Sequence, residues 1–382
     1  MICALLILAL CQDPAAVSES GRTAMHDRIA GGEGGEAWVA WTDIELDKDN
    51  PMVARIKILF AEFKGGKWSK PEQVNTAKGK FTEPRVAGGK TPVVAYLGTE
   101  SEEVGHVLDT LYIARRENAA WKSVKCLEGK ISQEDRWQHH YDFMEAADGA
   151  QHVVFQAARN ADVRYSKIGT KEEDIVTLFE VKDNPAGQIS AAVVGKTIYA
   201  AWVYDHDGEQ TLYVCRGDGV KFSEPTAVRA NEKFKGSFGP RWVTNGKDVW
   251  LIWGERVEPG MFGQDEYYAA PIEGDKPGKA EPFPARKKGA IGSIPVLEAR
   301  MDSAGKLHSA NADGLPDVTL GRTVRDGGSW KTGSTATLKR EMGTTSMKGM
   351  AISLNADGSL DLLWGETQMG DMSVQLRHLR LK

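Results

Sequence analysis

The sequence predicts an all-β fold, a single β-propeller of four-stranded antiparallel blades. Three observations lead to this prediction: a short apolar strand that ends near an aromatic residue recurs along the chain, Gly-rich turns separate the apolar runs, and no segment shows a sustained helical period with caps. Short runs rich in β-branched and aromatic residues are typical of strands. Four such strands, repeated around a ring, make the blades of a propeller.

The recurring strand appears in seven copies, at a step of roughly 50 residues, which is within the range of one propeller blade. The copies are residues 37–41, 92–96, 152–155, 198–202, 249–253, 307–310 and 360–364, of which the sixth is the weakest. Each copy is too small to bury its apolar face alone, so the copies form one domain. The count favours seven blades, with six as the alternative.

The flanks of each copy supply the other strands of a blade. A shorter apolar segment precedes the recurring strand, and a third strand, a hairpin turn and a fourth strand follow it. Gly65-Gly66 and Asp218-Gly219 are turn residues that suit positive φ. The last copy stops at Lys382 just after its third strand, so we expect residues 15–22 to supply the missing outer strand and close the ring.

The N-terminal residues look like an export signal. Residues 1–11 are almost purely apolar and too short to span a bilayer as a mature helix. Cys11 ends a stretch that resembles a lipoprotein cleavage box, so a lipid tether at Cys11 is the alternative to simple secretion. The predicted divisions are a leader at 1–11, an N-terminal segment with the closing strand at 12–26, and the propeller at 27–382. A secreted, periplasmic or cell-envelope location follows.

Composition excludes several classes of function. The net charge of −5 and the pI near 6.0 leave no basic footprint for nucleic acid. Only Cys126 and Cys215 lie in the body of the chain, so we expect two buried free thiols and no disulfide framework. No His or Cys cluster has metal-ligand spacing, so neither a metal nor a cofactor is predicted.

The hairpin turns resemble degenerate Asp-boxes, the Ser-x-Asp-x-Gly-x-Thr-Trp turns (BNR repeats) of the sialidase superfamily. The turn from Asp218-Gly219 to Phe222 is the nearest copy, and none is complete. The resemblance extends loosely from about Asp27 onward. It implies a propeller fold, because Asp-boxes are structural in that family.

The same resemblance directs attention to arginine. In sialidases three arginines hold the substrate carboxylate, and Arg28-Ile29 resembles the first Arg-Ile-Pro of the family with Ala30 in place of the proline. Arg28, Arg85 and Arg241 all lie at the start of the first strand of a copy, the strand that lines a propeller channel. We expect them to converge at one mouth and bind an anion through paired hydrogen bonds. The alternative is that each is salt-bridged to a neighbouring acid.

The residues at equivalent points in other copies are also polar. They are Tyr141, Gln188 and Ser293. Tyr141 is thus a candidate ligand-binding residue and a candidate nucleophile, since sialidases use a Tyr activated by a Glu. Glu145 shares its strand face by the period of two, but the family takes this Glu from another blade. The nearby His139-His140 pair favours hydrogen bonding in the channel or at the surface over metal binding.

Four acids follow the second strand of their copies: Asp43, Asp205, Glu255 and Glu366. Asp43 and Glu255 are further catalytic candidates, and Asp43, Asp205 and Glu255 could balance the arginines, although the regular recurrence favours a structural role. The sequence therefore favours a secreted sialidase-like propeller that binds a glycan or another anionic ligand, such as a carboxylated sugar, without established catalysis. A divergent exo-glycosidase of the sialidase type is the alternative, and enzymatic activity stays open.

Overall fold

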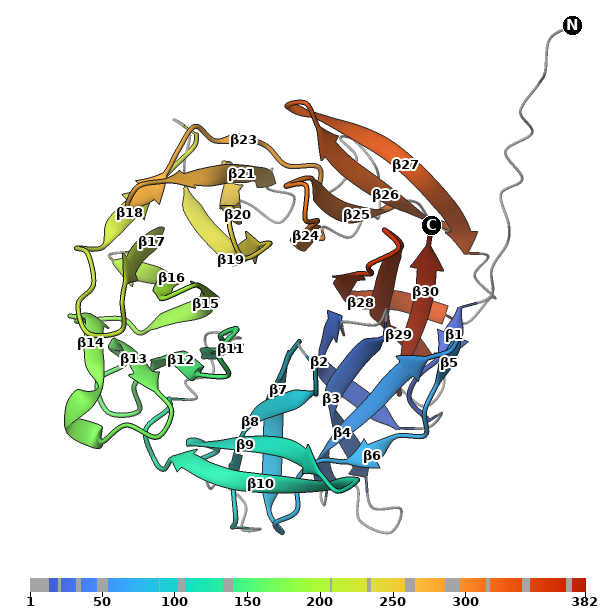
Figure 1. Ribbon diagram of the computed structural model, residues 1–382, viewed down its shortest axis with the longest axis horizontal. Helices are drawn as coiled ribbons and strands as arrows, with labels where there is room; N and C mark the ends of the chain where they lie inside the picture. Colours follow the sequence, from blue (N-terminus) through green and yellow to red (C-terminus); the bar gives the residue numbers. More distant parts are fainter. Residues whose placement is uncertain are drawn as a thin grey trace, which may run out of the picture.

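The chain folds into a ring of antiparallel β-sheets (Figure 1). The computed structural model describes residues 14–382 apart from 20–21, 32–35, 47–53, 89, 102–106, 133–139, 207, 232–234, 258–264, 286–295, 314–316, 339–343 and 369–372. The predicted all-β propeller is confirmed: the helical content of this described part is one exposed 3₁₀ turn, Glu172–Asp174. None of its helices is long and apolar enough to cross a membrane. The leader lies outside the described residues.

The strands follow the chain around the ring in groups, which we call blades and which run from the channel outward. The first is β2 (Thr23–Gly31), β3 (Ala37–Leu46), β4 (Ala54–Lys64), β5 (Lys67–Trp68) and β6 (Glu72–Gln73). The second is β7 (Lys80–Ala87), β8 (Val93–Thr99), β9 (Thr110–Glu117) and β10 (Ala120–Leu127). The third is β11 (Tyr141–Glu145), β12 (Gln151–Gln156), β13 (Val163–Lys167) and β14 (Val176–Phe179). The fourth is β15 (Ala186–Val194), β16 (Thr197–His206), β17 (Glu209–Gly217) and β18 (Thr226–Val228).

The second half of the chain continues the pattern. Its first group is β19 (Gly236–Thr244), β20 (Val249–Arg256), β21 (Asp265–Glu273), β22 (Lys276–Pro277) and β23 (Glu281–Pro282). Next come β24 (Ala299–Met301), β25 (Leu307–Asp313), β26 (Val318–Asp326) and β27 (Ser329–Leu338). The last is β28 (Thr344–Leu354), β29 (Leu360–Gln368), β30 (Val374–Leu381) and the N-terminal β1 (Ala15–Ala16).

Two single parallel bridges, Thr23 with Val374 and Gln210 with Gly236, join neighbouring blades into two nine-stranded sheets. Divided at these bridges, the described strands give the groups above. The number of blades in the whole chain, seven rather than six, stays a prediction.

The core lies between neighbouring blades. Wherever a second strand carries the recurring aromatic residue, that residue is completely or almost completely buried, and Trp41, Trp202, Trp253 and Trp364 are among the largest fully buried side chains. The second strand β25 carries no aromatic residue. The apolar clusters each combine residues of two successive blades, as where Trp41 and Leu363 meet at the junction of the first and last blades. A blade therefore depends on both neighbours for its stability.

The N-terminal segment pairs with the C-terminal blade. Ala15 and Ala16 lie opposite His378 and Arg377 of β30 in an antiparallel arrangement. Val17 is buried, and its N–H donates to the carbonyl of Leu376 at 2.9 Å. The two ends of the chain thus share one sheet, with β1 at its outer edge (Figure 1).

Both body cysteines are free thiols. Cys215 is buried, and burial raises its pKa to about 12. Cys126 was also expected to be buried, but it is partly exposed, because it lies on the outermost strand β10; burial raises its pKa to about 11.

Gly98 provides a test of the packing. It lies opposite Phe81 across the β7–β8 pair, and a Cβ at Gly98 would come within 2.2 Å of the fully buried Phe81 ring. Gly98→Ala is expected to lower the free energy of unfolding by about 1–3 kcal/mol, as overpacking does, measured by urea unfolding. Gly333→Ala is the matched control, because its Cβ would meet only ordinary contacts beyond 3.4 Å. If the two variants were equally stable, the close contact of Gly98 with the Phe81 ring would be contradicted.

Candidate binding site in the central channel

A repeated β-bulge sets the lining of the channel. In β2, β7, β15, β19 and β28 the register shifts, and pairing resumes at Arg28, Arg85, Ser190, Arg241 and Ala351 respectively. Each of these residues lies opposite the residue that precedes the buried aromatic of the second strand, as Arg85 lies opposite Ala95 before Tyr96. Bulges re-aim the side chains beside them, so these positions are structurally equivalent.

Two further strands complete the set with acids. Asp142 of β11 lies opposite Val154, which precedes Phe155, so it occupies the same position. Glu298 precedes Ala299, the first paired residue of β24. We call the residues at these positions, together with Glu298, the ring residues: Arg28, Arg85, Asp142, Ser190, Arg241, Glu298 and Ala351.

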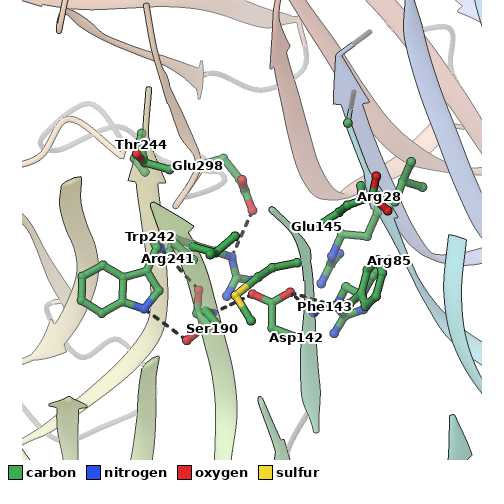
Figure 2. Close-up of a pocket in the computed structure, with 18 of the residues that line it drawn as sticks. Arg28, Arg85, Asp142, Phe143, Glu145, Ser190, Arg241, Trp242, Thr244 and Glu298 are labelled. Carbon is green, nitrogen blue, oxygen red and sulfur yellow. Dashed lines mark hydrogen bonds and ion pairs between the residues drawn. The ribbon is translucent and has the colours of Figure 1, made fainter. Parts of the chain in front are cut away.

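A cavity of about 350 Å³ lies among these strands, and all the ring residues except Ala351 line it. Figure 2 shows Arg28 and Arg85 on one side, Arg241 and Glu298 on the other, and Asp142 between Arg85 and Arg241. The structure therefore brings the three predicted arginines to one cavity.

The register places two other predicted channel residues, Tyr141 and Gln188, differently. Tyr141 lies one residue before the ring position, and a shift of one residue turns a side chain to the opposite face of a strand. Tyr141 is fully buried in the core between two blades and does not line the cavity; its hydroxyl donates to the carbonyls of Glu83 at 2.5 Å and Ala95 at 3.1 Å. Gln188 lies in the bulge and accepts a hydrogen bond from the Gly239 N–H at 2.5 Å. Ser293 lies outside the described residues.

Arg85 is held by protein groups on several sides. Its side chain is only 7% exposed, and it donates to the carbonyls of Pro84 at 3.1 Å and Tyr141 at 3.2 Å. It also lies 3.6 Å from Glu83, 3.8 Å from Asp142 and over the Tyr141 ring. These contacts give Arg85 a structural role beside the cavity.

Arg241 is more open to the cavity. Its side chain is 23% exposed, and its Nε donates to Glu298 at 3.1 Å. Arg300 of β24 shares the same carboxylate at 3.2 Å and is 34% exposed. Arg300 lines the cavity too, and the sequence reasoning missed it because the sixth repeat is weak.

The two ring carboxyls differ in their electrostatics. Asp142 accepts the Ala191 N–H of the next blade at 2.8 Å. Burial raises its pKa and outweighs the nearby arginines, chiefly Arg85. Burial alone would raise the pKa of Glu298 as well, but Arg241, Arg300 and Arg28 together lower it below its ordinary value. Glu298 is therefore the more firmly ionised of the two.

The acids predicted to balance the arginines lie elsewhere, so that prediction is wrong. Asp43 is buried against Arg22, and Asp205 accepts the Gly208 N–H at 3.0 Å in a turn. Glu255 is fully buried and accepts the N–H groups of Ala230 at 2.7 Å and Asn231 at 2.9 Å. The end of a second strand lies away from the bulge that defines the ring, so none of these acids lines the cavity. Glu83, Asp142 and Glu298 lie beside the arginines instead.

The other residues singled out in the sequence, Glu366, Glu145 and His140, contact charged side chains of the protein. Glu366 pairs with Arg377 at 2.9 Å, and Glu145 lines the cavity but is engaged by Arg115 at 3.0 Å. His140 is buried, with Nδ1 2.9 Å from Glu83, while His139 lies outside the described residues. The part of the chain that the structure describes holds no group of three His, Cys, Asp or Glu side chains able to bind a metal.

The candidate catalytic residues Tyr141, Asp43 and Glu255 do not line the channel cavity.

A ring of antiparallel blades around a charged channel defines this chain as a β-propeller. No protein-family model and no curated protein matches the sequence. Among solved structures, a polysaccharide lyase of family PL25, an ulvan lyase, is 11% identical with a TM-score of 0.55 over 96% of each chain. A protein of unknown function from Dyadobacter fermentans DSM 18053 is 12% identical with a TM-score of 0.52 over 96% of this chain and 97% of the other.

A leech intramolecular trans-sialidase also matches, at 11% identity and a TM-score of 0.45, over 98% of this chain and 70% of the other. At these identities the likeness concerns the fold alone. The propeller fold that the resemblance implied is confirmed at that level.

Proposed function

We propose that this propeller binds an acidic carbohydrate in its central channel, with the carboxylate of the ligand accepting hydrogen bonds from Arg241 and Arg300. The observation that carries the proposal is the convergence of arginines from different blades on one cavity. Guanidinium groups recognise carboxylates through two parallel hydrogen bonds. A channel lined by equivalent residues of several blades surrounds a ligand on all sides.

The charge balance supports an anionic ligand. The described residues that line the cavity include four arginines and three carboxyl groups, and one of these carboxyls, Glu145, is paired with Arg115 at its edge. On one side of the channel two of these arginines, Arg241 and Arg300, both contact the carboxylate of Glu298.

The fold neighbours are consistent with a carbohydrate. One structure of the ulvan lyase, with a TM-score of 0.53 at 11% identity over 95% of this chain and 94% of the other, holds -[GlcA(1-4)Rha3S]-, an acidic saccharide. That ligand belongs to the lyase, and fold alone does not transfer function. It supports a carbohydrate as the class of ligand, and the preference for a carboxylate rests on the arginines alone.

Calorimetric titration with methyl glucuronide and its neutral counterpart methyl glucoside tests the proposal. The wild-type protein is expected to bind the glucuronide and to bind the glucoside much more weakly. Arg241→Ala should weaken glucuronide binding roughly tenfold or more, because it removes a charge-assisted contact. Arg229→Ala is the control, since Arg229 is exposed and does not line the cavity. Equal binding of both sugars, or no effect of Arg241→Ala, would refute the proposal.

Hydrolysis of a glycoside is the second candidate function. Asp142 and Glu298 lie in one channel with pKa values shifted in opposite directions, as an acid and a base of such a reaction require. Product release from a fluorogenic sialoside or glucuronide, lost in Asp142→Asn, would favour the enzyme. Binding without product would favour the first proposal.

The location of the protein belongs to the same proposal. The apolar leader at residues 1–11 suits export to the cell envelope or the medium, where free acidic polysaccharides occur. N-terminal sequencing of the mature protein would test this, and lipid on Cys11 would indicate a membrane tether.

A further inference from the structure

The ring residues around the channel include both positive and negative side chains. In chain order the ring residues are Arg28, Arg85, Asp142, Ser190, Arg241, Glu298 and Ala351. Figure 2 shows Asp142 between Arg85 and Arg241, and Glu298 lies beside Arg241. The two acids come from different blades, so carboxylates are present on more than one side of the cavity (Figure 2).

Both carboxylates are fixed in place. Asp142 spans two blades, because one oxygen accepts the Ala191 N–H at 2.8 Å and the other the Phe143 N–H at 3.0 Å. Glu298 is held by Arg241 at 3.1 Å through one oxygen and by Arg300 at 3.2 Å through the other. Neither acid can turn away from the channel without losing these bonds.

Fixed acids beside fixed arginines favour one kind of ligand. An ionised carboxylate only accepts hydrogen bonds and a guanidinium only donates them. A sugar acid with one carboxylate and several hydroxyls can satisfy both, since the carboxylate accepts from Arg241 and Arg300 while hydroxyls donate to Asp142 or Glu298. A second anionic group would approach one of the acids, and facing like charges is a means by which binding sites reject wrong partners.

We infer that Asp142 and Glu298 are specificity-determining residues that select singly charged sugar acids and reject polyanionic saccharides such as multiply sulfated ones. The inference rests on the proposed function, because it concerns the same channel. It goes beyond that function by assigning the selection to two acids that no repeat motif identifies.

The test compares two probes on one set of variants by calorimetry. The probes are methyl glucuronide, with one charge, and a trisulfated heparin-type disaccharide. Wild-type protein is expected to bind the glucuronide at least tenfold more tightly. Asp142→Asn and Glu298→Gln, which keep the size of the side chain and remove its negative charge, should each shift this preference at least tenfold toward the sulfated probe. Glu209→Gln, on an exposed acid outside the cavity, is the control and should leave the preference unchanged.

The outcomes separate the two proposals. If the wild-type protein binds neither probe, the proposed function fails and the selectivity fails with it. If it binds the glucuronide but the preference is the same in wild type and in both acid variants, the selectivity is refuted and the proposed function stands. Thermal melting of each variant shows whether it is folded, and having two acid variants keeps the test decisive if one of them is not.

Discussion

Replacing Asp361 by alanine is expected to lower the free energy of unfolding by about 3–5 kcal/mol, the usual cost of breaking a buried ion pair. Asp361 is fully buried in the last blade and receives hydrogen bonds from Arg380 at 2.7 Å through both oxygens and from Asn355 at 2.8 Å. Its other neighbour, His378, lies 2.8 Å away. Truncation would remove this acceptor from Arg380, His378 and Asn355, and Asn355 would keep only its hydrogen bonds to Ser359.

The position of this network increases the expected effect. The ring of His378 contacts Phe63 and Trp68 of the first blade, and Arg380 lies over Phe63. Asp361 therefore orients the side chains that join the last blade to the first. Loss of Asp361 should loosen the closure of the ring as well as the blade itself.

The contribution of Asp361 should depend on pH in a defined direction. Burial alone would raise its pKa, but the hydrogen bonds from His378 and Arg380 outweigh burial and hold the pKa below the ordinary value of 3.8. A depressed folded-state pKa stabilises the protein fully at pH values well above 3.8, and this stability is lost as the pH falls through the folded-state pKa. The difference between wild type and Asp361→Ala should therefore shrink in acid.

Urea unfolding at neutral and acidic pH measures both effects. Asp326→Ala is the matched control, because Asp326 also pairs with two cations, Lys306 at 3.3 Å and Lys331 at 3.5 Å, but is 44% exposed. Exposed pairs contribute about 1 kcal/mol or less. If the two substitutions cost the same, the network at Asp361 does not have the role assigned to it.

Arg85→Ala is expected to have the second-largest effect, and to reduce stability rather than ligand affinity alone. The substitution removes a guanidinium that is 7% exposed and leaves Glu83 and Asp142 without their cation, which costs about 3–5 kcal/mol in comparable buried pairs. Arg241→Ala is a natural control, because it changes the equivalent residue of another blade, whose side chain is more exposed. We expect Arg241→Ala to be clearly milder in urea unfolding.

A double substitution identifies the cause. If the cost of Arg85→Ala arises from uncompensated carboxylates, Glu83→Gln in the same chain should recover part of the lost stability. A strictly additive pair, or an Arg85→Ala variant as stable as Arg241→Ala, would show that Arg85 is not the structural arginine described here.

The strands were predictable because their signal is local and repeated. Each of the recurring apolar runs falls on the second strand of a blade, from residues 37–41 in β3 to residues 360–364 in β29. Alternation of side chains with a period of two, punctuated by Gly-rich turns, is visible within about ten residues. The fold class needed no knowledge of contacts between distant segments.

The channel was predictable only in part. Arg28, Arg85 and Arg241 could be recognised because they recur at one point of the repeat. Asp142 could not be recognised, because comparing the repeat copies placed Tyr141 at this position. A difference of one residue decides whether a side chain faces the channel or the core. Arg300 was missed because its blade carries the weakest copy of the repeat.

The sequence alone thus determined a β-propeller with arginines on its inner strands, because periodicity and repetition are encoded within each copy. Only the tertiary structure decided what those arginines do. It buried Arg85 among Glu83, Asp142 and Tyr141, and left Arg241 and Arg300 open beside Glu298. The physical reason is that the charge on each arginine is balanced across neighbouring strands and blades, by residues as many as 57 positions away, and a bulge of one residue sets which of them face the channel.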